Sequence, residues 1–325
     1  MPQPGESESP PSDAPAPGRT YPPSSDGAGT PPFLVAAGLD HDPDESPVAA
    51  EGDLAGPPSG PFLDQPGAVP RDRADAGTWL LFAVVGFLVG SVVGLLFAAL
   101  AAELAGQGSH LAEIAKLSAP PEWYVAASLV GLWVGFIVGP WLASRFRGTR
   151  RFAADLGLRF RLVDLWGVAV GLLGQLLVDL MYAPFHHHHN FTKNFNAPTT
   201  RLTGASHGGG FVVIALLTVV GAPFFEELFF RGLLLRGLVR VCTPARRGRS
   251  LGRTFGVVAA VLLDGLLFGL AHGELVQLAG LAAFGMILAV VSYRTGRLGM
   301  NMVAHATFNL AAVLTIAGDR SVVFH

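Results

Sequence analysis

The chain has 325 residues, of which 50% are hydrophobic and only 14% are charged. This composition is typical of a polytopic membrane protein and argues against a soluble globular one. The single cysteine, Cys242, excludes an internal disulfide and a cysteine-based zinc finger. The net charge of -2 conceals an acidic N-terminal part and a basic remainder. We expect the lipid bilayer as a partner and no nucleic-acid partner.

The acidic part is residues 1–76, which hold 13 of the 24 Asp and Glu residues and 17 of the 24 prolines. This segment has no periodic apolar pattern, so it cannot bury enough apolar surface to offset its chain entropy. It also lacks the basic and apolar regions of a signal peptide. We therefore predict a disordered, solvated tail, with a docking or regulatory tail as the alternative.

Long apolar segments fill the rest of the chain, and a transmembrane helix needs about 20 mostly apolar residues. The segments are Trp79–Ala102, Trp123–Ser144, Leu165–Ala183, Phe211–Val241, Thr254–Ala271, Leu275–Tyr293 and Leu298–Gly318. The fourth is too long for a simple span and carries Pro223, which predicts a kink. The sequence thus predicts an all-α, polytopic membrane helix bundle of seven transmembrane helices, or eight if Pro223 splits the fourth segment.

Arginine clusters set the predicted orientation, because positive loops stay on the cytoplasmic side. They follow the second span (Arg145 to Arg161), follow the fourth (Arg236 to Arg253), and separate the sixth from the seventh (Arg294 and Arg297). With seven crossings these loops share one face. We predict a multi-pass plasma-membrane protein whose N-terminal tail is cytoplasmic.

The fourth segment carries the motif Glu226-Glu227-x-x-x-Arg231. A charge at the centre of a membrane helix costs roughly 2.5–3.5 kcal/mol, so three of them indicate an interior functional site. Glu227 and Arg231 lie one turn apart and can form a structural ion pair. Glu226 points about 100° away and stays available as a general base. The alternative is a single structural ion-pair cluster of all three residues.

The fifth segment places Asp264, Phe268 and His272 at intervals of four residues, hence on one helix face. His272 could orient a water, ligate a metal or share a proton with Glu226; in isolation it reads as a helix cap. Asp264 either supports the site from behind or faces a polar cavity, and the sequence favours neither.

The last segment carries His305-x-x-x-Asn309, also one turn apart. Both side chains can donate hydrogen bonds, as a developing oxyanion requires. The pair could also ligate a metal, His better than Asn, or form interhelical hydrogen bonds.

Other patterns indicate structure or carry no function. Gly86, Gly90 and Gly94 have the spacing of close helix packing. The run His186–His189 could bind a metal adventitiously, but consecutive side chains do not converge on one ion. A phosphate-binding loop, a Gly-x-Ser-x-Gly nucleophile motif and a His-Glu-x-x-His motif are absent from the sequence.

The three clusters, in this order and each within an apolar helix, resemble the signature of the CPBP family of intramembrane proteases, the CAAX-protease and bacteriocin-processing (Abi) family. The resemblance covers roughly residues 210–316. Together with the composition and the apolar segments, it gives a tail (1–76), accessory transmembrane helices (77–209) and a protease-like core (210–316). The resemblance itself says nothing specific about the tail or the first three spans.

The resemblance implies a membrane-embedded endopeptidase that acts on a peptide or protein substrate in or at the membrane, near the C-terminus of a prenylated or other membrane-associated protein. It implies that Glu226 and His272 activate water and that His305 and Asn309 stabilise the oxyanion. Glu227 and Arg231 would hold the helix, with Phe268 and Asp264 in support.

The family has been described both as metalloproteases and as glutamate-dependent, metal-free proteases. If the enzyme is zinc-dependent, the ligands would be Glu226, His272 and His305, and zinc would lower the pKa of its water to about 7. The main alternative function is a non-proteolytic scaffold or bacteriocin-immunity-type protein that keeps the polar cavity. A transporter is a further alternative, since intramembrane Glu and His can relay protons.

Overall fold

The computed structural model describes residues 73–185, 208–243 and 250–323, and within these ranges every regular element is helical. The all-α prediction is confirmed for this part of the chain. Nearly all of the predicted tail lies outside it, although α1 (Arg73–Leu104) begins before the predicted boundary at residue 76. The histidine run His186–His189 also lies outside the described residues.

Six helical segments of the described residues are long and apolar enough to cross a membrane. They are Asp75–Leu104, Glu122–Arg147, Leu162–Phe185, Gly209–Cys242, Leu251–Ala271 and Leu278–Thr295. They correspond to the first six predicted spans and confirm a polytopic helical membrane protein. The predicted seventh span forms α12 (Gly299–Val323), which is not among the six, so the count of seven stays a prediction.

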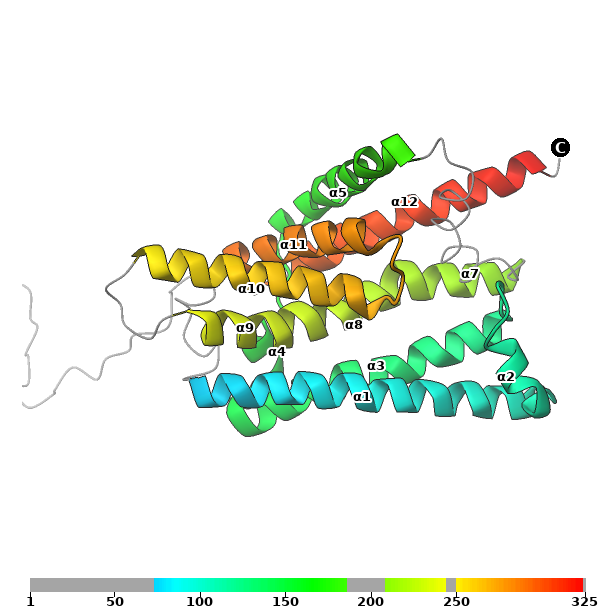
Figure 1. The fold of residues 1–325 in the computed structure, drawn as a ribbon, viewed down its shortest axis with the longest axis horizontal. Coiled ribbons are helices and arrows are strands. Elements are labelled where there is room, and N and C mark those ends of the chain that lie inside the picture. Colours follow the sequence, from blue (N-terminus) through cyan, green and yellow to red (C-terminus); the bar gives the residue numbers. More distant parts are fainter. Residues whose placement is uncertain (1–72, 186–207, 244–249, 324–325) are drawn as a thin grey trace, which may run out of the picture. The chain divides into compact units, whose positions relative to one another are not determined.

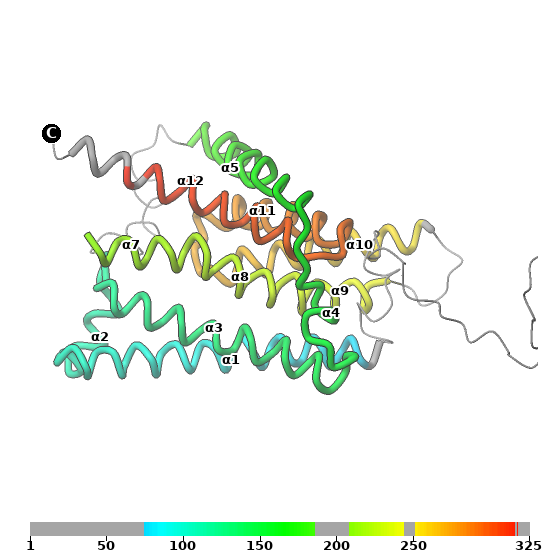
Figure 2. The backbone as a smooth tube through the Cα atoms, turned by 180° about the vertical axis from the view of Figure 1, so that it is seen from behind, coloured from blue at the N-terminus to red at the C-terminus, as the bar shows by residue number. Residues whose placement is uncertain are grey.

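A long central helix separates two groups of helices (Figures 1 and 2). This central helix runs from α7 (Gly209–Leu216) to α9 (Leu235–Cys242). On one side of it, α1 pairs with α3 (Glu122–Arg147). On the other side lie α5 (Gly167–Tyr182), α10 (Ser250–Ala271), α11 (Leu278–Thr295) and α12. The short helices are η3 (Gly108–His110), α2 (Leu111–Ile114), α4 (Phe152–Leu156), η4 (Leu162–Trp166) and η5 (Ala183–Phe185).

Glycines let α1 and α3 pack with their backbones in contact, as the spacing of Gly86, Gly90 and Gly94 predicts. A Cβ atom at Gly90 would lie 2.4 Å from the carbonyl oxygen of Leu132. From the other helix, a Cβ at Gly135 would lie 2.5 Å from the Cα of Gly90. No side chain fits in this space, so the interface requires glycine on both helices.

The central helix is a single segment of 34 residues, Gly209–Cys242, as expected for the unsplit fourth span. It widens into π-helix twice, in η6 (Leu217–Gly221) and η7 (Leu228–Leu234), on either side of α8 (Ala222–Glu227). Pro223 explains the first widening, because proline has no N–H to donate and its ring clashes with the carbonyl one turn earlier. The irregularity is therefore a π-turn before the proline, and such turns are frequent at functional sites.

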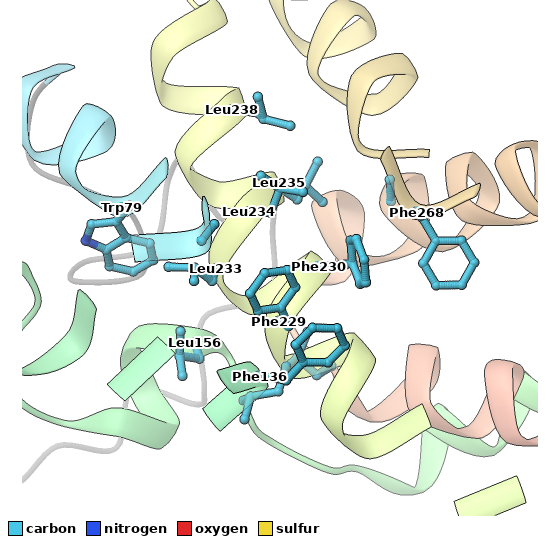
Figure 3. Close-up of a cluster of buried hydrophobic side chains, with 14 of the residues drawn as sticks. Trp79, Phe136, Leu156, Phe229, Phe230, Leu233, Leu234, Leu235, Leu238 and Phe268 are labelled. Carbon is cyan, nitrogen blue, oxygen red and sulfur yellow. The ribbon is translucent and has the colours of Figure 1, made fainter. Parts of the chain in front are cut away.

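Aromatic side chains form the core between the central helix and its neighbours (Figure 3). The rings of Phe136 and Phe229 stack with their centroids 4.3 Å apart. On the opposite side, Phe230 meets the edge of Phe268 at 5.2 Å. This layer links α3, the central helix and α10, and it fixes the position of the helix that carries Glu226 and Glu227.

The α10–α11 hairpin is shorter than the α1–α3 pair. Its helices have 22 and 18 residues, against 32 and 26 in α1 and α3. In both views the connection between α10 and α11 ends well before the tip of the α1–α3 pair. The connection begins at His272, directly after α10, and His272 is within 4.0 Å of the Glu226 carboxylate.

The α1–α3 interface gives the first testable prediction. Gly135→Ala should lower the free energy of unfolding by about 1–3 kcal/mol, because its new methyl group would collide with backbone atoms of α1. Gly77→Ala, also in α1 but with no atom within 4 Å of the added Cβ, is the matched control. Thermal unfolding in detergent measures both variants. Equal stability of the two would contradict backbone contact at Gly135.

Candidate active site

The carboxylate of Glu227 is the centre of a buried polar cluster. Its Oε1 atom accepts a hydrogen bond from Arg231 Nη1 at 2.9 Å and lies 2.9 Å from His305 Nδ1. Its Oε2 atom accepts a hydrogen bond from Asn301 Nδ2 at 3.1 Å. Glu227 and Arg231 are both completely buried, so the predicted ion pair forms inside the bundle. Glu227 also reaches His305, a contact that the sequence did not indicate.

Arg231, in η7 of the central helix, also contacts α10 and α11. Besides Glu227, its guanidinium donates to the carbonyl oxygen of Gly285 in α11 at 2.9 Å. Its Nε atom lies 3.4 Å from Asp264 Oδ2 in α10, and it sits over the ring of Phe268 at 4.4 Å. Two roles were expected for Asp264, a supporting residue behind the site or a residue that faces a polar cavity. Asp264 is completely buried against Arg231, which favours the supporting role.

Glu226 faces away from Arg231, as the helix geometry predicts, and faces two imidazoles. Its Oε2 atom is 4.0 Å from His272 Nε2 and 3.8 Å from His305 Nε2. That oxygen is buried and has no hydrogen-bond partner among the described residues. The structure therefore brings Glu226, His272 and His305 together, at distances too long for direct hydrogen bonds.

The other ring nitrogens define the tautomers of the two histidines. His272 Nδ1 lies 2.8 Å from the carbonyl oxygen of Phe268, which can only accept, so Nδ1 carries the proton. By the same reasoning His305 Nδ1 donates to the Glu227 carboxylate. In the neutral rings both Nε2 atoms then present lone pairs to Glu226. The predicted role of His305 as a hydrogen-bond donor requires a second proton on its ring.

Phe268 forms an aromatic wall beside both imidazoles. Its ring centroid lies 4.8 Å from that of His272 and 5.6 Å from that of His305. Phe284, from α11, meets His305 at 5.9 Å from a second direction. These contacts hold both rings in orientation and leave their Nε2 edges toward Glu226.

Asn309 lies on the same stripe of α12 but contacts a different group. Its Nδ2 atom donates to the carbonyl oxygen of Thr218 at 2.8 Å. Thr218 belongs to the π-turn η6, which supplies this carbonyl as an acceptor. The second N–H of the Asn309 amide remains for another acceptor. Among the described residues Asn309 contacts this π-turn, and no hydrogen bond or ion pair joins it to His305 or Glu226, so the convergence of His305 and Asn309 stays a prediction.

Asn301 is a site residue that the sequence analysis missed. It is completely buried and donates both to Glu227 and to the carbonyl oxygen of Leu288 at 2.7 Å. Its spacing was a usable signal, because Asn301, His305 and Asn309 follow one another at intervals of four residues on α12.

A zinc ion would need its ligands closer together than they lie. Among the described residues no group of three His, Cys, Asp or Glu side chains is arranged to hold a metal ion. Zinc–ligand distances of about 2.0–2.1 Å place tetrahedral ligands nearer to each other than the 3.8 and 4.0 Å that separate the histidines from Glu226. The present arrangement of these three side chains does not fit zinc, so the reaction proposed below contains no zinc-dependent step.

A half-open cavity adjoins these residues. It has a volume of about 370 Å³ and is lined by Glu226 and His272, by α3 residues from Tyr124 to Phe136, and by Glu274 and Gln277. A second, almost entirely apolar groove of about 320 Å³ runs between α1 and α10. Phe87, Phe230 and Ala271 line both. The cavity that holds Glu226 and His272 is therefore adjacent to an apolar groove between α1 and α10.

Comparison with known proteins gives one finding for the part of the chain that contains the site. Residues 208–311 match the family described as Rce1-like, type II CAAX prenyl endopeptidase Rce1-like. This match confirms the family resemblance and coincides closely with the predicted core of residues 210–316. No curated protein and no solved structure matches the chain.

The Glu227–Arg231 pair gives a second prediction. Arg231→Met should destabilise the protein by about 3–5 kcal/mol, because it leaves the Glu227 carboxylate buried without a cation. Adding Glu227→Gln should restore much of that stability, since the double variant removes both charges of the pair, while Asp264 is the same in both variants. Unfolding in detergent and the amount of folded protein in the membrane measure both effects. A double variant no more stable than the single one would contradict charge pairing as the cause.

The contact of Asn301 gives a third prediction. Asn301→Leu should cost about 1–3 kcal/mol, because Glu227 Oε2 loses its donor. It should also change the ¹⁵N NMR signals of His305, because the Glu227 carboxylate becomes free to rotate away from Nδ1. Ser292→Ala, which removes a buried hydroxyl without a hydrogen-bond partner among the described residues, is the control. Unchanged His305 signals in Asn301→Leu would remove Asn301 from the site.

Proposed function

We propose that this integral membrane protein is an intramembrane endopeptidase, because residues 208–311 match the Rce1-like CAAX endopeptidase family. The observation that carries the proposal is the unpartnered Oε2 of Glu226, which faces the lone pairs of two imidazoles. When both rings are neutral, three acceptor atoms face one another, and a molecule that donates hydrogen bonds would satisfy them. Water fits this requirement, and water is the nucleophile of peptide hydrolysis.

Glu226 and His272 are the proposed acceptors of the attacking water. A water between them donates one hydrogen bond to Glu226 Oε2 and another to His272 Nε2, which directs its oxygen lone pair toward a peptide carbonyl. Glu226 takes the proton as the oxygen attacks the carbonyl carbon. The same carboxyl group then protonates the leaving amine nitrogen when the C–N bond breaks, so the proton balance closes.

His305 and Asn309 are the proposed donors to the oxyanion. The remaining N–H of the Asn309 amide is one donor. His305 becomes the second when its ring is protonated on both nitrogens, and the carboxylates of Glu226 and Glu227 on either side balance that charge. Glu227 acts in this scheme as a positioning residue for His305 as well as the partner of Arg231.

The proposed substrate is a membrane-associated peptide or protein. The apolar groove lined by Phe229, Leu234 and Leu267 supports this, because it leads from the bilayer to the cavity that contains Glu226. The family suggests a bond near the C-terminus of a prenylated protein, and we retain this as the first substrate to test. The arginine clusters support a cytoplasmic location for the N-terminal tail.

Glu226→Gln tests the reaction. The purified protein in detergent, assayed on prenylated and unmodified peptide libraries, should lose cleavage in this variant, because an amide cannot accept the proton of water. Glu103→Gln, on an exposed glutamate of α1, is the matched control and should cleave normally.

The same assay with a chelator and a measurement of bound zinc separates the two chemistries. Cleavage lost with chelator and in Glu226→Gln would indicate a metalloprotease; cleavage lost in the variant alone would indicate a glutamate-dependent one. Normal cleavage by Glu226→Gln would refute the assignment. Absence of cleavage by the unmodified protein would favour the scaffold or immunity function.

A further inference from the structure

The two ends of the helical bundle differ in charge. One end carries the arginines that follow α3, close α9, begin α10 and close α11. These are Arg145, Arg147, Arg150, Arg151, Arg159, Arg161, Arg240, Arg253, Arg294 and Arg297. Lys116 is the basic residue near the other end among the described residues, beside Glu103, Glu113, Glu122 and Glu274. We call these the arginine-rich end and the arginine-poor end.

Contacts between distant segments confirm that each set lies at one end. At the arginine-rich end, Arg147 reaches Asp75 at 3.4 Å, and the backbone N–H of Leu298 donates to the carbonyl of Gly157. At the arginine-poor end, the start of α7 meets the start of α3, because a Cβ at Gly210 would touch the side chain of Glu122.

Buried polar side chains are hydrogen-bonded to one another and to the backbone at the arginine-rich end. Arg297 Nη2 donates to Asp164 Oδ1 at 2.7 Å, and Arg236 Nη2 donates to the carbonyl of Gly296 at 3.1 Å. Asp155, also completely buried, accepts from Ser144 at 2.6 Å. Arg236, Asp155 and Asp164 have almost no exposed surface, so these polar side chains are packed into the interior at this end.

The cavity that contains Glu226 lies toward the other end. Its lining includes Pro120 just before α3, and Tyr124 and Ser128 in the first turns of α3. It also includes Glu274 and Gln277 from the connection that follows α10. His272 is the exposed member of the site, with 32% of its side chain accessible. Apart from Glu226 and His272 themselves, the polar side chains of the cavity wall therefore lie toward the arginine-poor end.

We infer that the active site takes water and substrate from the side of the membrane opposite the arginine-rich end. Because positive loops stay in the cytoplasm, that side is extracytoplasmic. The substrate class is then a membrane-anchored protein whose scissile peptide bond is presented at the outer face, not a cytoplasmic one. This substrate class rests on the proposed peptidase function, whereas the direction of access does not.

Cysteine accessibility tests the direction of access without any enzymatic assay. In a Cys242→Ser background, Leu275→Cys reports on the connection after α10, and Leu162→Cys reports on the arginine-rich end. The two leucines are 80% and 88% exposed, so both positions accept a substitution. Gln107→Cys, in the exposed turn after α1, marks the arginine-poor end itself. Each variant is treated with a membrane-impermeant maleimide on intact and on permeabilised cells.

We expect Leu275→Cys and Gln107→Cys to be labelled equally in intact and permeabilised cells, and Leu162→Cys to be labelled only after permeabilisation. The reverse pattern would overturn the inference by placing the arginine-poor end in the cytoplasm. Labelling of Gln107→Cys but never of Leu275→Cys would overturn it as well, because the cavity would then be closed to external water. Since no substrate is needed, failure here is distinct from failure of the Glu226→Gln assay.

Discussion

The ion pair of Glu227 and Arg231 at the centre of the bundle is the interaction on which the rest of the site depends. Both side chains are removed from water, so their charges require satisfaction by the protein. They obtain it from α10, α11 and α12, through Asp264, the carbonyl of Gly285, Asn301 and His305. Each helix that contributes one of these contacts is held at a defined rotation about its own axis. The pair thereby couples the folding of the core to the placement of His305.

The two adjacent glutamates, Glu226 and Glu227, have different surroundings as a result. Helical geometry turns Glu226 about 100° from Glu227, away from Arg231 and toward the cavity. The Glu227 carboxylate is fully engaged in structural contacts. The Glu226 carboxylate keeps one oxygen without a hydrogen-bond partner among the described residues, beside two imidazoles. A buried atom without a partner costs stability, and such costs concentrate at functional positions.

The sequence predicted the helical class, the six described spans and the Glu227–Arg231 pair because periodicity and spacing carry these features directly. It could not predict the π-turns, since the widening at Thr218 depends on how Pro223 is accommodated and on the acceptor that Asn309 needs. It also missed Asn301, although Asn301 lies one turn before His305, because the spacing alone does not show that its partner is Glu227 in another helix. The expected zinc ligands are brought near one another, but their spacing arises from side-chain orientations that no motif encodes.

The unequal lengths of the two hairpins have a consequence for the surrounding lipid. At 1.5 Å per residue the 18 residues of α11 span about 27 Å, whereas the 32 residues of α1 extend about 48 Å. A hydrocarbon layer of about 30 Å cannot match both. The 22 residues of α10 give about 33 Å, so the α10–α11 hairpin matches this layer closely and the mismatch falls on α1, which can tilt or extend beyond the hydrocarbon. The connection that begins at His272 would then lie at the edge of the hydrocarbon layer, within reach of headgroups and water, while the tip of the α1–α3 pair projects past it.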